Sequence, residues 1–152
     1  MTSPNEKLNI SPNGLVILKD YEKFSAKWYL CSSKKWTIGW GHVRTSKDRF
    51  DTVTLEEADK LLQSDCLIAE TCIKKFVKVA LNQNQFDALT TFVFNIGITA
   101  FSESTILRLL NEGKFEQASE QFGRWIYPES SRRGLIKRRN RECALFLKPI
   151  DL

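Results

Sequence analysis

Apolar residues recur at helical spacing from the first part of the chain onward. Ser11 followed by Pro12 is typical of a helix start, because serine caps the first turn and proline is tolerated at its first position. The apolar positions that follow predict a helix as far as about Lys23. These positions are Leu15, Leu18 and Phe24.

The pattern then changes to one typical of strands. In the segment WYLCSSKKWTIGWGH, residues 28–42, aromatic and β-branched runs flank four polar residues. This arrangement predicts a β-hairpin or a small sheet.

A long helix follows. Thr54 and Glu57 have the spacing of a capping box, and apolar residues then return at helical spacing as far as Phe76. The predicted helix covers about residues 55–79, which is long for a globular protein. A long helix between two apolar clusters often joins two lobes.

The rest of the chain has the pattern of a helical bundle. Asn82 can cap a helix that stops at Gly97, and further helices are predicted at 103–111, 115–126 and 134–147. The fold class is therefore α+β, mostly α, in a single domain over 1–152. We expect a small lobe over about 11–54, which would carry the catalytic residues, a linking helix over about 55–79 and a helical lobe over about 80–152.

Charge is distributed unevenly along the chain. The formal net charge is +5, and between residues 124 and 141 seven basic residues face one acidic residue, Glu129. A one-sided basic surface favours a polyanion: nucleic acid, an anionic membrane or a carboxylate-rich cell wall. The aromatic residues are not interleaved with the basic run, which argues against nucleic acid. The segment Leu135–Phe146 is either a solvated helix face with its apolar side packed inward or a surface that attracts anionic walls or membranes.

Cysteine and histidine usage argues against a metal site. There is no CxxC motif and a single histidine, so we expect no metal and no cofactor. The polar N-terminus, residues 1–9, has no signal-peptide core, and no apolar run could span a membrane. We therefore expect a protein made in a cytoplasm, with free thiols at its four cysteines and disorder confined to the N-terminus. The cysteines are Cys31, Cys66, Cys72 and Cys143.

Glu22 is the first candidate for chemistry. It lies near the end of the first predicted helix, where the partial negative charge of the helix disfavours an ionised carboxylate. Trp28 and Phe24 could reduce its hydration, and a carboxyl group that keeps its proton can act as a general acid. The alternative is an ordinary solvated glutamate. The predicted hairpin would fold Cys31 and Thr37 back beside this helix end, so that a carboxyl group, a possible base and a hydroxyl would line one cleft.

The spacing E(x8)C(x5)T followed by WTIGWGH resembles the catalytic segment of the phage-type lysozymes, glycoside hydrolase family 24. Three later segments resemble the same family in the same order, so that the resemblance covers about residues 11–147. They are NQNQFDALTTFVFNIG, STILRLLNEGKFEQASEQFGRW and GLIKRRNRECALF. The resemblance implies a lysozyme-like fold, with a small β-hairpin lobe joined by the long helix to a helical C-terminal lobe.

The resemblance also implies roles for the three residues of the motif. Glu22 matches the general acid, and Thr37 matches the threonine that helps to hold the attacking water. Cys31 stands where many members have aspartate. A thiol there could act as the base for water, act as a transient nucleophile or merely fill space. We favour the base, in keeping with the inverting outcome that the family implies.

Four further residues take roles from the resemblance. His42 and Asp65 are expected to form an ion pair between the small lobe and the long helix. Asn95 and Arg124 are expected at the cleft or its floor, where Asn95 could bond the sugar and Arg124 could meet a peptide-stem carboxylate. For Arg124 a plain surface charge is an equal alternative.

The predicted function is that of an endolysin: a muramidase that hydrolyses the β-1,4 bond between N-acetylmuramic acid and N-acetylglucosamine during host lysis. A lytic transglycosylase, or a non-enzymatic membrane-active or wall-binding basic module, is the alternative. The expected partner is bacterial peptidoglycan, with no nucleic acid, possible electrostatic contact with an anionic membrane or wall, and a monomeric state. By this resemblance we expect the protein to wait in the host cytoplasm and to reach the cell wall or periplasm through holin pores on lysis.

Overall fold

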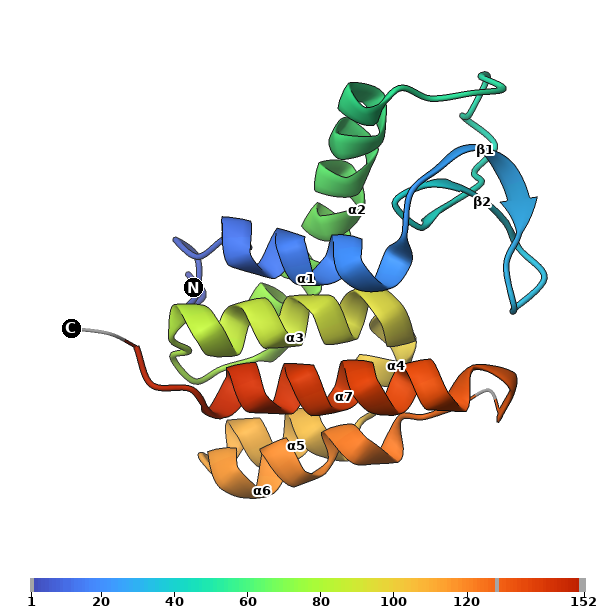
Figure 1. Ribbon diagram of the computed structural model, residues 1–152. Coiled ribbons are helices and arrows are strands. Elements are labelled where there is room, and N and C mark those ends of the chain that lie inside the picture. The colour runs from blue at the N-terminus through green and yellow to red at the C-terminus, as the bar shows by residue number, and fades with distance from the viewer. Residues whose placement is uncertain (1, 128, 151–152) are drawn as a thin grey trace.

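The computed structural model describes residues 2–127 and 129–150. A small sheet and the first half of a long helix form one lobe, and a layered set of helices forms the other (Figure 1). In chain order the elements are α1 (Pro12–Glu22), β1 (Ser25–Leu30), β2 (Trp36–Gly39), β3 (His42–Val43), α2 (Leu55–Phe76), α3 (Gln83–Ile96), α4 (Ile98–Ser102), α5 (Thr105–Asn111), α6 (Phe115–Glu120), the 3-10 turns η1 (Phe122–Arg124) and η2 (Glu129–Ser131), and α7 (Arg132–Leu147). The predicted fold class is confirmed.

The first helix begins and ends as the sequence predicts. The Ser11 side chain accepts a hydrogen bond from the backbone N–H of Gly14, with Pro12 at the first helical position. Ser11 is itself held by the buried carboxylate of Asp87 in α3, which accepts from the Ser11 N–H at 2.9 Å. Although the sequence grouped this helix with the small lobe, α1 packs on α3 and lies beside it in Figure 1. At Lys23 the backbone has φ 59°, which ends the helix and turns the chain into the sheet.

The β region is a three-stranded antiparallel sheet in the order β1-β2-β3. Tyr29 pairs with Thr37, and Ile38 pairs with His42. Ile38 is fully buried and packs with Val53 and with Ala58 of α2. The inner face of the sheet is thereby fixed to the first half of the long helix.

Helix α2 joins the lobes because it contributes to three apolar clusters in turn. Ala58 belongs to the cluster under the sheet, Leu62 and Cys66 pack with Leu18 of α1, and Ile73 lies in the main helical core. The capping box of Thr54 and Glu57 is present at its start. The helix ends at Phe76 because the next residue, Val77, adopts an extended conformation.

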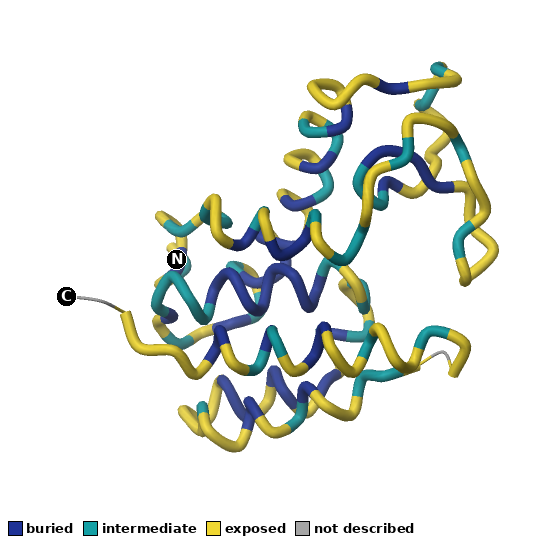
Figure 2. The backbone as a smooth tube through the Cα atoms, viewed as in Figure 1, coloured by how far each residue is buried: buried dark blue, intermediate teal, exposed yellow. Residues whose placement is uncertain are grey.

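The helical lobe is organised around α3, which is buried along most of its length (Figure 2). Asn82 and Gln85 form a capping box at its start, and the helix ends at Gly97, where φ is 93°. The predicted helix at 103–111 begins two residues later, at Thr105, and the unpredicted short helix α4 precedes it. The predicted helix at 115–126 is broken into α6 and the 3-10 turn η1.

The N-terminal segment is more ordered than its composition predicts. The Asn5 side chain is 1% exposed. It donates to the Val79 carbonyl at 3.0 Å and accepts from the Leu81 N–H at 2.8 Å. The expected disorder is therefore wrong for residues 2–9, because one buried amide side chain anchors this segment to the loop between α2 and α3; Met1 lies outside the described residues. All four cysteines are free thiols. Over the described residues, none of the helices has both the length and the apolar character needed to cross a bilayer.

Candidate active site

Glu22 is the last residue of α1 and points between the lobes, with its side chain 18% exposed. The β2–β3 turn passes directly over it. Gly41 in this turn has φ +77°, and a Cβ atom there would lie only 2.9 Å from Glu22 Cδ. Glycine is thus required both by the backbone conformation and by the carboxyl group beneath it. Gly41 was not among the site residues predicted from the sequence.

A buried arginine from the far end of the chain holds the Glu22 carboxyl group. Arg138 of α7 donates from Nη1 to Glu22 Oε2 at 2.9 Å, and from Nη2 to the Thr91 carbonyl at 2.8 Å. Its side chain is 4% exposed. The expectation of a solvated basic face on this helix is therefore wrong for Arg138 and for its neighbour Arg139, which is 1% exposed. Both residues were missed at the level of sequence because a run of arginines is usually solvated.

Cys31 follows β1 directly and begins the turn to β2. Its N–H donates to the Lys35 carbonyl at 3.0 Å, and its Sγ lies 3.0 Å from Ser33 Oγ. Burial opposes ionisation of this thiol, but hydrogen bonds from the Ser33 and Thr37 side chains and from the backbone of the turn outweigh it. Together they lower the pKa of Cys31 to about 7. A considerable thiolate fraction is therefore present near neutral pH.

Thr37 lies on β2 and is 3% exposed. Its hydroxyl group donates to the Lys35 carbonyl at 3.0 Å. The same proton can be donated instead to the Cys31 thiolate, and in either case the oxygen keeps its lone pairs for other donors.

Glu22, Cys31, Thr37 and Asn95 line one cleft of about 390 Å³ between the lobes. Glu22 comes from α1, the thiol and the hydroxyl from the sheet, and Asn95 from the end of α3. The structure therefore brings four of the five predicted catalytic and substrate-binding residues to the same cavity. The Oδ1 atom of Asn95 accepts from Arg139 Nη2 at 2.7 Å, which leaves the amide N–H groups as its donors.

Arg124 lies elsewhere. It is exposed on η1 and does not line the cleft. In this short turn the apolar neighbours point inward: Phe122 and Trp125 both contact the Phe92 ring edge-on. The arginine between them is turned to the surface. The predicted position at the cleft or its floor is therefore not what the structure shows.

His42 lies on β3 between two carboxylates. Its Nδ1 is 2.8 Å from Asp65 Oδ2 on α2, and its Nε2 is 3.0 Å from Asp48 Oδ2 in the following loop. The hydrogen bond to Asp65 raises the pKa of His42, burial lowers it, and the bond to Asp48 raises it further. Asp48 was missed because it lies in a polar loop with no regular spacing to the histidine.

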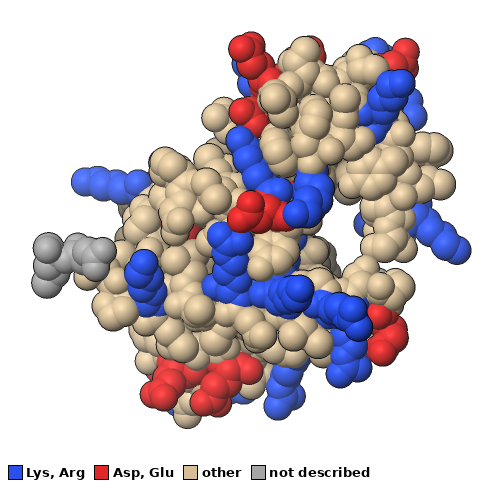
Figure 3. Space-filling model, viewed as in Figure 1, with Lys and Arg blue, Asp and Glu red and all other residues tan. Residues whose placement is uncertain are grey.

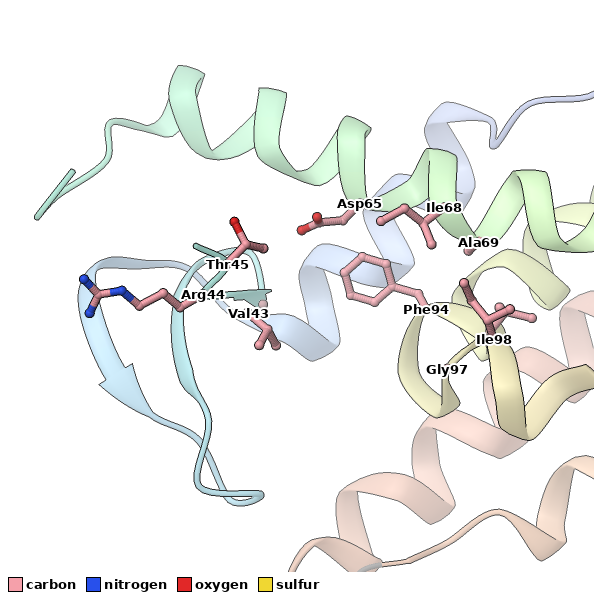
Figure 4. Close-up of a pocket in the computed structure, with 11 residues that line it drawn as sticks. Val43, Arg44, Thr45, Asp65, Ile68, Ala69, Phe94, Gly97 and Ile98 are labelled. Carbon is pink, nitrogen blue, oxygen red and sulfur yellow. The ribbon is translucent and has the colours of Figure 1, made fainter. Parts of the chain in front are cut away.

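A second cavity of about 310 Å³ adjoins the cleft and shares Gly41, Val43, Phe94 and Gly97 with it. Figure 4 shows Val43 and Thr45 on the sheet side, facing Phe94 and Ile98 of the helical lobe. The groove between the lobes therefore continues beyond Glu22. Within residues 2–127 and 129–150, no group of three His, Cys, Asp or Glu side chains could hold a metal ion.

Comparison with known proteins identifies the family. The phage lysozyme family model matches residues 19–142. An endolysin of Acyrthosiphon pisum secondary endosymbiont phage 1 is 40% identical over 144 residues, 91% of this chain and 98% of the relative. An endolysin of Salmonella phage P22 is also 40% identical over 144 residues, 92% of this chain and 99% of the relative.

A solved structure supports the same assignment. The muramidase domain of SpmX from Asticcacaulis excentricus superimposes with a TM-score of 0.84 at 37% identity, covering 94% of this chain and all of that domain (100%). The matched family residues include Glu22, Cys31 and Thr37 in the cleft, and Arg138 beneath it. The chain belongs to the phage lysozyme family.

Proposed function

We propose that this member of the phage lysozyme family is an endolysin, a glycoside hydrolase that cuts the β-1,4 bond between N-acetylmuramic acid and N-acetylglucosamine in peptidoglycan. The proposal rests on the three side chains that the structure brings together. The Glu22 carboxyl group, the Cys31 thiol and the Thr37 hydroxyl line a single cleft between the lobes. These are the groups that hydrolysis of a glycosidic bond requires: an acid for the leaving oxygen and a base with a held water.

In this mechanism Glu22 gives its proton to the glycosidic oxygen as the bond from the sugar C1 breaks. Water forms the new bond to C1 and passes its proton to the Cys31 thiolate. The Thr37 oxygen accepts a hydrogen bond from that water through a lone pair, while its own proton is donated to the Lys35 carbonyl or to the Cys31 sulfur. Attack by water on the face opposite the leaving group inverts the configuration at C1.

Two further residues act on binding and shape. Asn95, whose Oδ1 is taken by Arg139, donates its amide N–H to the N-acetyl carbonyl or to a hydroxyl of a sugar. His42 and Asp65 tie the sheet to α2, so that the sheet keeps its position above Glu22. Arg124 lies outside the cleft, and a contact with a peptide-stem carboxylate would have to occur there.

A lytic transglycosylase is the second candidate, because a cysteine stands in place of the second carboxylate. In that reaction the C6 hydroxyl of muramic acid replaces water. Product mass separates the two reactions: hydrolysis leaves a reducing end, whereas the transglycosylase leaves an anhydro sugar.

A non-enzymatic basic module is less well supported. Lys and Arg side chains gather along the face that contains α7 (Figure 3). Two of the arginines of that helix are nevertheless buried, which leaves fewer cations for an anionic membrane or wall. We also propose that the protein reaches the wall through holin pores and that it acts as a monomer.

The decisive experiment is digestion of purified cell wall with the products weighed. Glu22→Gln removes the transferable proton and is expected to lower the rate by at least about 100-fold while the protein still binds the wall. Cys31→Ala is expected to lower the rate similarly, and Cys31→Asp to retain activity. Glu116→Gln, at an exposed position of α6, and Cys143→Ala, outside the cleft, are the matched controls. Full activity of Glu22→Gln would refute the enzymatic proposal, and full activity of Cys31→Ala would refute the role of the thiol alone.

A further inference from the structure

A compact group of four charged side chains lies at the base of the cleft. It consists of Glu22 from α1 and of Arg138, Arg139 and Glu142 from α7. Glu142 is fully buried, with 0% of its side chain exposed. It is the carboxylate that neither lines the cleft nor enters the mechanism above.

Glu142 contacts both arginines. Its Oε2 lies 3.2 Å from Arg138 Nε, and its Oε1 lies 2.8 Å from Arg139 Nε. The Thr91 hydroxyl group is 2.7 Å from Oε2 and can donate to it. The spacings i,i+4 and i,i+3 along one helix place both guanidinium groups against this one carboxylate.

Each arginine then contacts a residue of the cleft. Arg138 reaches Glu22 at 2.9 Å, and Arg139 reaches Asn95 at 2.7 Å. The Arg139 guanidinium also lies over the Phe92 ring, 4.9 Å from its centroid. Through two adjacent side chains, a single buried carboxylate is thus connected to two cleft residues.

We propose that Glu142 is a positioning residue that allows Glu22 to keep its proton, by balancing one of the two buried guanidinium charges beside it. The inference rests on the proposed role of Glu22 as the general acid. When Glu22 carries its proton, the group contains two cations and one anion. Without Glu142 it would contain two cations and no anion, and the most direct relief would be loss of the Glu22 proton.

The other groups that face Glu22 do not provide this balance. Tyr29 and the Cys31 thiol approach from the sheet, and Lys35 lines the same cleft. A thiolate at Cys31 favours the protonated form of Glu22, but it is consumed when it takes the proton of water. α3 contributes the neutral carbonyl of Thr91. Burial raises the pKa of Glu142, and the two guanidinium groups and the Thr91 hydroxyl offset only part of that rise.

The test is a pH titration of the Glu22 side chain in the full chain, in which NMR of the carboxyl carbon monitors protonation. Glu142→Gln preserves the shape but removes the anion, and the Glu22 titration midpoint is expected to fall by about one pH unit. Arg139→Met removes one cation and is expected to raise the midpoint. The double variant restores the native charge balance, and its midpoint is expected to return toward the wild-type value.

Turnover provides the second measurement. At a pH above both midpoints, lowering the midpoint by one pH unit reduces the protonated fraction of Glu22 about tenfold. The kcat of Glu142→Gln is therefore expected to fall by that factor at fixed pH. Restoration of the Glu22 titration midpoint by the double variant would not occur if Glu142 only supported the fold. Glu112→Gln, which breaks an exposed pair with Arg108 and Lys114, is the charge-loss control. Its midpoint is expected to equal that of the wild type.

The outcomes separate this inference from the proposed function. If Glu142→Gln does not fold, a raised midpoint in Arg139→Met still supports charge balance. An unchanged or lowered midpoint in Arg139→Met overturns the inference, as does a Glu142 carboxyl group that is protonated in the wild type at pH 7. Either result leaves the proposed function intact if Glu22→Gln is inactive. Activity of Glu22→Gln overturns the acid role itself.

Discussion

Arg138 on the last helix donates to the carboxyl group of Glu22 at the end of the first helix, over 2.9 Å. The two residues are 116 positions apart in the chain. The contact fixes the orientation of the acid and joins α1 to α7 beneath the cleft. Changes to this contact and to the groups around it are therefore expected to have measurable effects.

Replacement of Arg138 is expected to damage both stability and catalysis. Arg138→Met leaves buried Glu142 with one guanidinium partner, which is expected to cost about 3 kcal/mol in the free energy of unfolding. Arg138→Lys keeps the charge but not the three-way hydrogen bonding, so kcat is expected to fall by about 100-fold with a smaller loss of stability. Urea unfolding and wall digestion measure the two effects. Arg141→Lys, in an exposed pair with Asp20, is the control.

Gly41→Ala is expected to displace the Glu22 carboxyl group. The new Cβ would lie 2.9 Å from Glu22 Cδ, and a shift of the acid by about 1 Å is expected to reduce kcat by about 100-fold. Gly113 has the same φ of +77°, and no atom lies within 4 Å of the position that a Cβ would take there. Gly113→Ala is therefore expected to lose about 1 kcal/mol of stability with activity intact. Equal activity losses in both variants would show that backbone strain, and not the contact with Glu22, is responsible.

Cys31 is expected to be the most reactive of the four thiols. Its pKa is about 7, whereas burial raises that of Cys66 to about 12 and also raises those of Cys72 and Cys143. Iodoacetamide at pH 7 is expected to label Cys31 first and to abolish wall digestion in parallel. Mass spectrometry of the labelled peptides measures the selectivity.

A variant of the turn tests the cause of this reactivity. Ser33→Ala removes one hydrogen bond to the Cys31 sulfur, so the pKa of the thiol should rise and labelling at pH 7 should slow. Unchanged labelling in this variant would be inconsistent with stabilisation of the thiolate by the turn. Ser102→Ala, on α4 and away from the cleft, is the matched control.

His42 is expected to make the stability depend on pH. The raised pKa of His42 means that its contribution is fully present below the unfolded value of about 6.5 and is lost as pH rises through the higher folded value. Asp65→Asn removes the main cause of the shift and should lower the His42 pKa, at a cost of about 1–3 kcal/mol in acid solution. Histidine NMR and urea unfolding at several pH values measure both. Parallel stability curves for wild type and Asp65→Asn would contradict the pairing.

The local signals in the sequence were sufficient to predict much of the fold. The caps at Ser11, Thr54 and Asn82 are local hydrogen-bonding patterns, and each begins a helix as predicted. The apolar spacing after Thr54 likewise predicted the linking helix. The spacing of Glu22, Cys31 and Thr37, with the family resemblance, was enough to select residues that line one cleft.

Only the tertiary structure decided which charges are buried and what they contact. The arginines of α7 look alike in sequence, yet Arg138 and Arg139 are buried while Arg141 is paired with Asp20 at the surface. Burial of a charge depends on partners supplied by distant segments, here Glu22 and Asn95, and local spacing contains no information about them. The outward position of Arg124 was decided in the same way, by the packing of its apolar neighbours against α3.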